Sequence, residues 1–151
     1  MARSRCIGAF VRPSPTALGG EKFLASSQPT RGVLRVTRHP FLWFVVLWAV
    51  THLLVNADAG SLIFFGGLGL TALWGSFDID RKRRRTHPVE FAQFEAQTSN
   101  VPLLAVLGRR NQLVLGELWL PLLLGLALAL GVIALHPHLF SGASAVPRLH
   151  G

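Results

Sequence analysis

The fold is decided by residues 38–58, RHPFLWFVVLWAVTHLLVNAD, which place a histidine inside an apolar run of membrane-spanning type. Residues 41–55 carry no formal charge, and His52 is their only strongly polar side chain. This run predicts a transmembrane helix. His52 would lie one turn before the far end of that helix, near one face of the membrane and away from its midplane.

The start of this helix has its own signals. Pro40 suits the first helical turn, because the amide hydrogen that it lacks would be unpaired there in any case. A helix over residues 40–56 would rise roughly 25 Å, slightly less than the hydrocarbon thickness. Anchoring at the interface by Trp43 or Arg38 would compensate for the difference.

His52 is the leading candidate for chemistry. Desolvation in lipid keeps an imidazole neutral, and the neutral ring is the form that ligates a metal. An ionisable residue inside a membrane marks a functional site by default. We therefore predict that His52 ligates haem iron or another metal. The structural alternative is a hydrogen bond from His52 to a neighbouring helix.

Composition favours a membrane protein. The chain has 151 residues, half of them hydrophobic, and a mean hydropathy of +0.44, which is high for a soluble domain. A formal net charge of +8 would suggest nucleic acid on soluble helices, but the basic residues cluster beside the apolar runs. We therefore expect the lipid bilayer as partner and no nucleic acid. The single cysteine, Cys6, allows no intramolecular disulfide and no Cys-x-x-Cys for zinc or covalent haem.

Two further apolar runs predict two further spans, over about residues 60–77 and 114–135. Five cations at residues 81–85 follow the second run directly, which is a strong positive-inside signal. With three spans, a cytoplasmic N-terminus and the C-terminus on the other side, this basic run and the other basic residues beside the spans lie in the cytoplasm, as the positive-inside rule requires.

The second run carries small residues every four positions, at Gly67, Thr71 and Gly75. Such a face lets two helix backbones approach closely in lipid. It predicts close packing against the first span.

Residues 86–107 have a different pattern from the spans. Phe91 and Phe94 alternate with the polar residues Glu90, Gln93 and Glu95. The pattern predicts a short amphipathic helix lying in the membrane interface. Its carboxylates are expected to pair with the preceding basic run.

The ends of the chain are predicted to be tails. Residues 1–30 mix Arg, Ser, Pro and Gly without a long apolar run and are expected to form a disordered basic tail. Residues 143–151 are expected to be disordered as well. Between them, residues 31–142 would form one all-α membrane domain of three transmembrane helices and one interfacial helix.

Four further residues are candidates with open roles. Arg38 and His39 either anchor the first span at the interface or hold an anion or a cofactor carboxylate on the inner face. The predicted topology gathers His52, His136 and His138 toward the outer face. His136 is therefore a candidate second metal ligand, with interfacial capping as the alternative for both terminal histidines.

Several separated motifs occur in a fixed order. They are Thr37-Arg38-His39-Pro40, Trp48 with His52, Asp80-Arg81, Thr98-Ser99-Asn100-Val101-Pro102, Gly108-Arg109 and His136-Pro137. Their order and spacing over about residues 31–142 resemble the NnrU family of bacterial membrane proteins. The same pattern is similar to the 15-cis-zeta-carotene isomerases, which are haem b relatives of that family.

The resemblance implies a haem b cofactor with His52 as an axial ligand. The isomerases carry a cysteine three residues before that ligand, where this chain has Ala49. Relatives also have spans upstream of Arg-His-Pro, and in the isomerases one of these supplies the second axial histidine. We expect either that this chain is a shortened product or that a second chain supplies the missing spans. His136 within this chain is the alternative second ligand.

Three functions follow from these resemblances. The first is a multi-pass, haem-associated protein of the bacterial inner membrane that supports nitrite and nitric oxide metabolism in denitrification. The second is a haem-dependent cis–trans isomerase of zeta-carotene-like polyenes. The third is a distant resemblance to isoprenylcysteine carboxyl methyltransferases, which would make Arg38 and His39 contacts of S-adenosylmethionine.

Overall fold

The computed structural model describes residues 14–17, 19–24, 30–56 and 58–139, and every regular element among them is helical. This confirms the all-α prediction. The elements are η1 (Glu21–Phe23), η2 (Gly32–Arg35), α2 (Pro40–Val55), α3 (Ala59–Thr86), α4 (Pro88–Gln97), α5 (Leu104–Leu107), η3 (Leu115–Glu117) and α6 (Trp119–Leu139). They belong to two compact units, Met1–Val114 and Leu115–Gly151, which are described separately.

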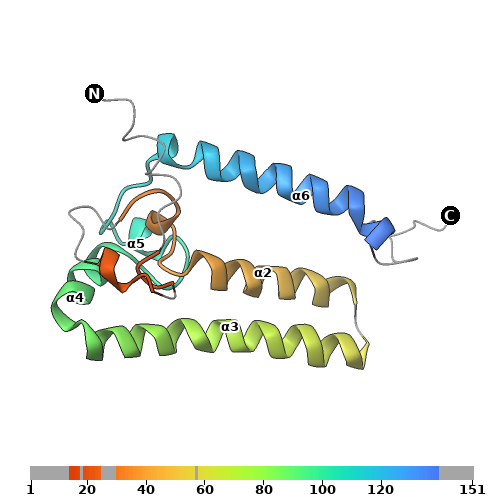
Figure 1. Cartoon of the computed structure of the whole chain (residues 1–151), viewed down its shortest axis with the longest axis horizontal. Helices are drawn as coiled ribbons and strands as arrows, with labels where there is room; N and C mark the ends of the chain where they lie inside the picture. Colours follow the sequence, from red (N-terminus) through yellow and green to blue (C-terminus); the bar gives the residue numbers. More distant parts are fainter. Residues whose placement is uncertain (1–13, 18, 25–29, 57, 140–151) are drawn as a thin grey trace. The chain divides into compact units, whose positions relative to one another are not determined.

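The first unit is organised around the helices α2 and α3, which lie side by side and run in opposite directions (Figure 1). Pro40 is the first residue of α2, as expected from its missing amide hydrogen. Asp58 caps the start of α3, since its carboxylate accepts a hydrogen bond of 2.9 Å from the amide of Ser61. The short connection between the helices brings their apolar lengths together.

Close packing of α3 against α2 occurs, but the predicted contact face was wrong. A Cβ added at Gly69 would meet the Cβ of Ala49 at 3.1 Å, whereas one added at Gly67 or Gly75 would meet nothing within 4 Å. Ala72 is buried on the same side of α3 as Gly69. Each residue turns about 100° around a helix, so a two-residue offset puts the contact on nearly the opposite side from Gly67.

The helix α3 continues through the basic run and ends at Thr86, beyond the predicted end of the span. The amphipathic helix expected over residues 86–107 is α4, which is shorter than predicted. Its Phe91 and Phe94 are fully buried and form a core with Leu24. Leu24 belongs to a segment for which the sequence predicts disorder, yet residues 14–17 and 19–24 make defined contacts because the aromatic face of α4 offers apolar cover. Residues 1–13, 18 and 25–29 of that tail lie outside the described residues.

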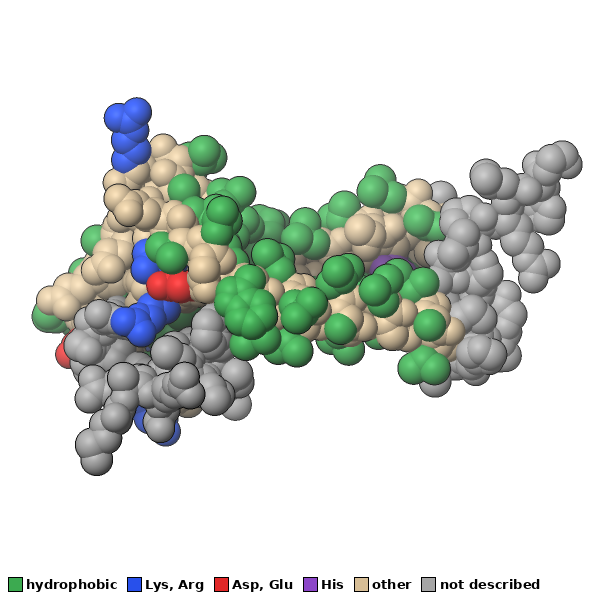
Figure 2. Space-filling model, turned by 90° about the horizontal axis from the view of Figure 1, so that it is seen from above, with side chains coloured by type: hydrophobic (Ala, Val, Ile, Leu, Met, Phe, Trp, Pro, Cys, Tyr) green, Lys and Arg blue, Asp and Glu red, His purple; other side chains and the backbone are tan. Residues whose placement is uncertain are grey.

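Apolar side chains cover the outer faces of α2 and α3. Phe41, Leu54, Ile63 and Trp74 are examples of large hydrophobic residues that the unit leaves exposed. Among the described helices, α3 is long and apolar enough to cross a membrane, while α2 and residues 119–135 of α6 are apolar but shorter. Figure 2 shows that charged side chains gather toward one end while hydrophobic ones follow the helices.

The second unit consists of η3 and α6. The third predicted span was expected to begin near residue 114, but α6 begins at Trp119. Glu117 therefore lies in η3, outside the apolar helix. The backbone of α6 includes His136 and His138, whose side chains lie outside the described residues, as does the C-terminal tail over residues 143–151.

Candidate functional site

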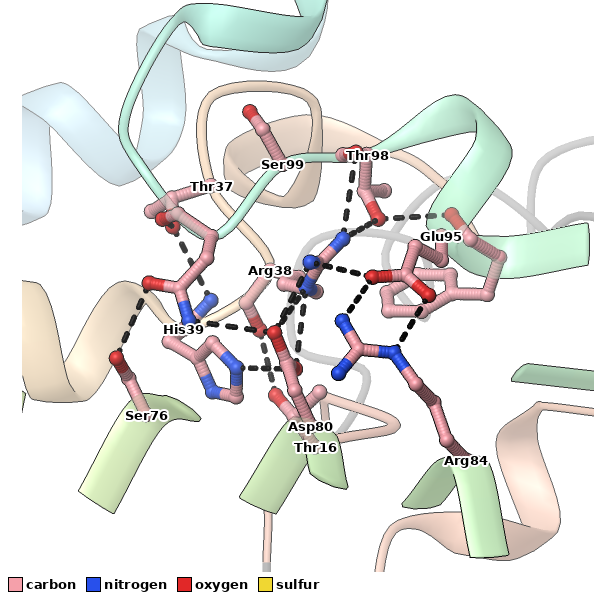
Figure 3. Close-up of polar contacts among 12 residues, drawn as sticks. Thr16, Thr37, Arg38, His39, Ser76, Asp80, Arg84, Glu95, Thr98 and Ser99 are labelled. Carbon is pink, nitrogen blue, oxygen red and sulfur yellow. Dashed lines mark hydrogen bonds and ion pairs between the residues drawn. The ribbon is translucent and has the colours of Figure 1, made fainter. Parts of the chain in front are cut away.

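A buried polar cluster lies where α2 begins and α3 approaches its end (Figure 3). We define the polar cluster as Arg38, His39, Asp80, Glu95, Thr98 and Asn100. Asp80 is its centre, with a side chain only 2% exposed. It comes from α3, directly before the basic run, whereas its partners come from the loops before α2 and after α4 and from α4 itself.

The guanidinium of Arg38 forms ion pairs with two carboxylates. Its Nε donates to both oxygens of Asp80 at 3.1 and 3.0 Å, and its Nη2 lies 2.9 Å from Asp80 Oδ2 and 3.1 Å from Glu95 Oε1. Nη1 donates to the carbonyl of Thr98 at 3.3 Å. The guanidinium also lies 5.8 Å from the ring centre of Phe91. A charge this deeply buried is stable here because several acceptors replace its water.

His39 and Asn100 complete the shell around Asp80. His39 Nε2 lies 2.8 Å from Asp80 Oδ1, and Asn100 donates to Oδ2 at 3.2 Å. The side-chain oxygen of Asn100 accepts from Ser76 at 3.0 Å and from the indole of Trp43 at 3.3 Å. Both carboxylate oxygens of Asp80 are therefore used, as a buried carboxylate requires.

Backbone hydrogen bonds hold the two loops of the cluster in register. The amide of Arg38 donates to the carbonyl of Ser99 at 2.9 Å, and the amide of Leu103 donates to the carbonyl of Val36 at 2.7 Å. Leu103 adopts a positive φ of 65°, which allows the chain to turn into α5. These hydrogen bonds join the loop before α2 to the loop after α4, and the cluster lies where the two loops meet.

Glu95 joins the cluster to the basic run. Arg84 donates to Glu95 Oε2 at 3.0 Å and to Oε1 at 2.5 Å, which confirms the predicted pairing of this carboxylate. The hydrogen bonds from Arg84, with the nearby charges of Arg38 and Arg84, hold the pKa of Glu95 below its usual value of 4.5 although partial burial opposes this. Glu95 therefore stays ionised and shares its charge between the two arginines.

Arg38 and His39 lie in a different environment from the one that the sequence predicts. Both were expected at the lipid interface or on a cofactor carboxylate, but both are buried and bonded to Asp80. An external carboxylate would have to displace Asp80 and Glu95 from Arg38. Asp80 and Asn100 appear in the sequence motifs but were not predicted as site residues. An acidic side chain directly between an apolar run and five cations was the available signal for Asp80.

His52 lies near the other end of α2. Its Nδ1 is 2.8 Å from the carbonyl oxygen of Trp48, and its ring stacks on Phe65 with centroids 4.6 Å apart. The Trp48 ring lies 4.5 Å away on a tilt. A carbonyl oxygen only accepts, so Nδ1 carries the hydrogen and the neutral ring keeps its lone pair on Nε2. Metal-bound histidines commonly donate their second ring nitrogen to a backbone carbonyl in this way.

The predicted grouping of His52 with His136 and His138 stays a prediction, because the side chains of His136 and His138 lie outside the described residues. His39, the N-cap of α2, and His52 are thirteen residues apart, which corresponds to roughly 20 Å along the helix axis. His87 Nδ1 hydrogen-bonds Thr86 at 2.9 Å beyond the far end of α3. Within the described side chains, no cluster of three histidine, cysteine or acidic residues could hold a metal ion. His52 is thus a candidate single ligand.

Comparison with known proteins adds a family to this geometry. Residues 7–144 match the family described as "NnrU protein". The chain is 34% identical over 129 residues, 79% of its length, to "15-cis-zeta-carotene isomerase, chloroplastic" of Arabidopsis thaliana. It is 28% identical over 82 residues, 54% of its length, to the protein of the same name in Zea mays. The chain spans 33% and 22% of the length of these two relatives. No solved structure shows significant similarity to it.

Proposed function

The chain belongs to the NnrU family, and from this premise we propose that it is a membrane-embedded haem protein with His52 as an iron ligand. The single observation that carries the proposal is the hydrogen bond of the His52 ring to the carbonyl of Trp48. Its Nδ1 donates to Trp48, so Nε2 is the nitrogen that a metal would take. Ring contacts from Trp48 and Phe65 restrict rotation of the imidazole.

The described residues fit haem better than a metal ion whose ligands all come from the protein. A haem iron needs only one or two protein ligands, because the porphyrin supplies the other four. His52 provides one of them. We propose that His136 or a second chain with further spans supplies the other, since the relatives are much longer than this chain. When bound, haem would supply an iron centre whose redox state controls binding and reactivity.

The proposed reaction is cis–trans isomerisation of a zeta-carotene-like polyene. The relatives carrying this name support it, at 34% identity over most of the chain. The exposed apolar faces of α2 and α3 suit a substrate that dissolves in lipid. In this proposal the aromatic residues beside His52 exclude water from the substrate side of the site.

Nitrogen-oxide metabolism is the second candidate. Family membership supports it. A second support is that the described residues supply a single histidine, His52, near that end of α2. If His52 were the single protein ligand of a haem, that haem could also bind nitric oxide. In this reading the protein supports denitrification in the inner membrane of a bacterium.

We also propose three membrane spans, formed by α2, α3 and α6, with the N-terminus in the cytoplasm. The five cations at residues 81–85 support this orientation. An S-adenosylmethionine-dependent reaction receives less support, because Arg38 and His39 are already bonded to Asp80.

The test is an absorbance spectrum of the full chain, purified in detergent from cells supplied with haem. We expect a Soret band that His52→Ala abolishes and that His87→Ala retains, because His87 lies at the far end of α3. A colourless wild-type protein, or a band that survives His52→Ala, would contradict the proposal. Conversion of zeta-carotene isomers in carotenoid-accumulating cells favours the isomerase, whereas a Soret shift with nitric oxide and no such conversion favours the second candidate.

A further inference from the structure

A second site lies beside His39, at the opposite end of α2 from the proposed haem ligand. A cavity of about 250 Å³ opens there. It is lined by Ser14, Thr16, Ala17, His39, Pro40, Phe41, Leu42 and Ile79. Its walls are mostly apolar, and its polar groups come from only three of these residues. It is smaller than the roughly 300 to 1,000 Å³ of pockets that enclose a drug-sized molecule, so it suits the head of a ligand whose body lies elsewhere.

Among the described residues, Asp80 is the hydrogen-bond partner of the His39 ring. Nε2 faces Asp80, a carboxylate that also accepts from Arg38 and Asn100, so Nε2 carries the hydrogen. In the neutral form of the ring, Nδ1 then carries the lone pair, and no hydrogen bond from a described residue reaches that atom. The side chain is only 1% exposed. A polar atom in a side chain with so little exposure gains from a hydrogen bond that a ligand or water could supply.

The other polar groups of the cavity are acceptors too. Thr16 donates its hydroxyl hydrogen to the carbonyl of Arg38 at 2.5 Å. Ser14 lies 2.8 Å from the Thr16 hydroxyl and 3.3 Å from the same carbonyl, so its hydrogen is also used within the chain. Each hydroxyl therefore offers only lone pairs to a ligand. A lipid phosphate is disfavoured, because its oxygen atoms are hydrogen-bond acceptors and would face the acceptor atoms of the cavity.

The apolar side of the cavity points to a lipid-soluble ligand. Phe41 is 72% exposed and belongs to the apolar surface of α2. Leu42 and Ile79 continue the wall onto α2 and α3. A ligand with its head beside His39 could therefore lay an apolar body along these helices without entering water.

We propose that this cavity binds the hydroxyl head of a membrane-soluble alcohol or phenol, which donates its hydrogen bond to His39. Asp80 positions the imidazole for this role, since it holds the ring with Nε2 turned away from the ligand. The site is independent of the proposed haem ligand, because the two histidines lie roughly 20 Å apart along the helix.

The experiment uses a matched pair of probes with the full chain in liposomes. Binding of radiolabelled para-octylphenol and of its methyl ether is measured by equilibrium dialysis, with empty liposomes as the partition baseline. Both probes have the same apolar body, but the ether has no hydrogen to donate. We expect saturable binding of the phenol and binding at least about tenfold weaker for the ether, as loss of one buried hydrogen bond implies.

Two variants locate the binding. Leu42→Trp fills the cavity without touching the polar cluster and should abolish saturable binding, whereas His52→Ala should leave it unchanged. His39→Phe should reduce phenol binding to the level of the ether if the variant remains folded. Equal binding of phenol and ether by the wild-type chain, absence of saturation, or undiminished binding by Leu42→Trp would overturn the proposal.

Discussion

At the scale of single residues, Asp80 lies at the centre of the polar cluster. It binds two cationic or titratable partners, Arg38 and His39, and one amide, Asn100, in a place that water does not reach. A buried ion pair of this kind contributes little net stability over an apolar replacement, but it is costly to break from one side. Its value here is specificity, because one carboxylate fixes two loops and a helix in a single arrangement.

Asp80→Asn is therefore expected to destabilise the chain strongly. The amide would leave the charge of Arg38 without its main partner, at a cost of about 3–5 kcal/mol. Thermal unfolding of the detergent-solubilised protein would measure the loss.

Asp78→Asn is the matched control for this variant. Asp78 is only two residues away, but its side chain is 63% exposed and its one ion pair, with Arg81, is 4.0 Å long. We expect the control to unfold at the wild-type temperature. Equal unfolding temperatures for the two variants would show that the cluster does not hold the fold.

At the scale of elements, α2 and α3 approach each other closely at Gly69. Gly69 faces Ala49, which is 1% exposed, and nothing larger than glycine fits between the two backbones without movement. Helices in lipid gain no hydrophobic free energy from meeting each other, so such backbone contacts and the polar cluster hold the pair together.

Gly69→Leu is expected to separate the two helices locally, with a cost of about 1–3 kcal/mol from overpacking. Gly67→Leu is the control, because a side chain there meets nothing within 4 Å. Both variants gain the same helix propensity, so the difference between their unfolding temperatures isolates the contact. If Gly67→Leu were the more damaging variant, the originally predicted face would be the true contact.

At the scale of the whole molecule, charge and apolar surface are segregated. The basic run and its acidic partners lie at the end of α3 that carries the polar cluster, while the remaining length of α2 and α3 exposes large apolar side chains. A soluble protein of this size rarely leaves so much contiguous apolar surface uncovered. Lipid is the environment that would cover it.

The number of spans is testable through the position of the C-terminus. Three spans with a cytoplasmic N-terminus put the C-terminus outside, whereas two spans keep it inside. A bacterial host making the full chain fused at Gly151 to alkaline phosphatase should show phosphatase activity, because that enzyme folds only outside the cytoplasm. A fusion after Gln112 should be inactive. Activity of the second fusion alone, or extraction of the chain by alkaline carbonate, would contradict the proposed topology.

The sequence by itself determined the helical class, the apolar lengths and the caps. These are local properties: Pro40 starts a helix because of its ring, and Asp58 caps one because its carboxylate reaches the next turn. The pairing of Glu95 with basic residues was also predictable, because five cations precede it closely in the sequence.

Only the tertiary structure decided which side chains meet. The assembly of Arg38, His39 and Asp80 joins residues about forty positions apart, and no periodicity reports such a contact. The choice of Gly69 over Gly67 depends on the rotation of α3 about its axis, which the polar cluster at its end constrains. The orientation of the His39 ring is likewise set by Asp80, which lies on another helix and bonds Nε2.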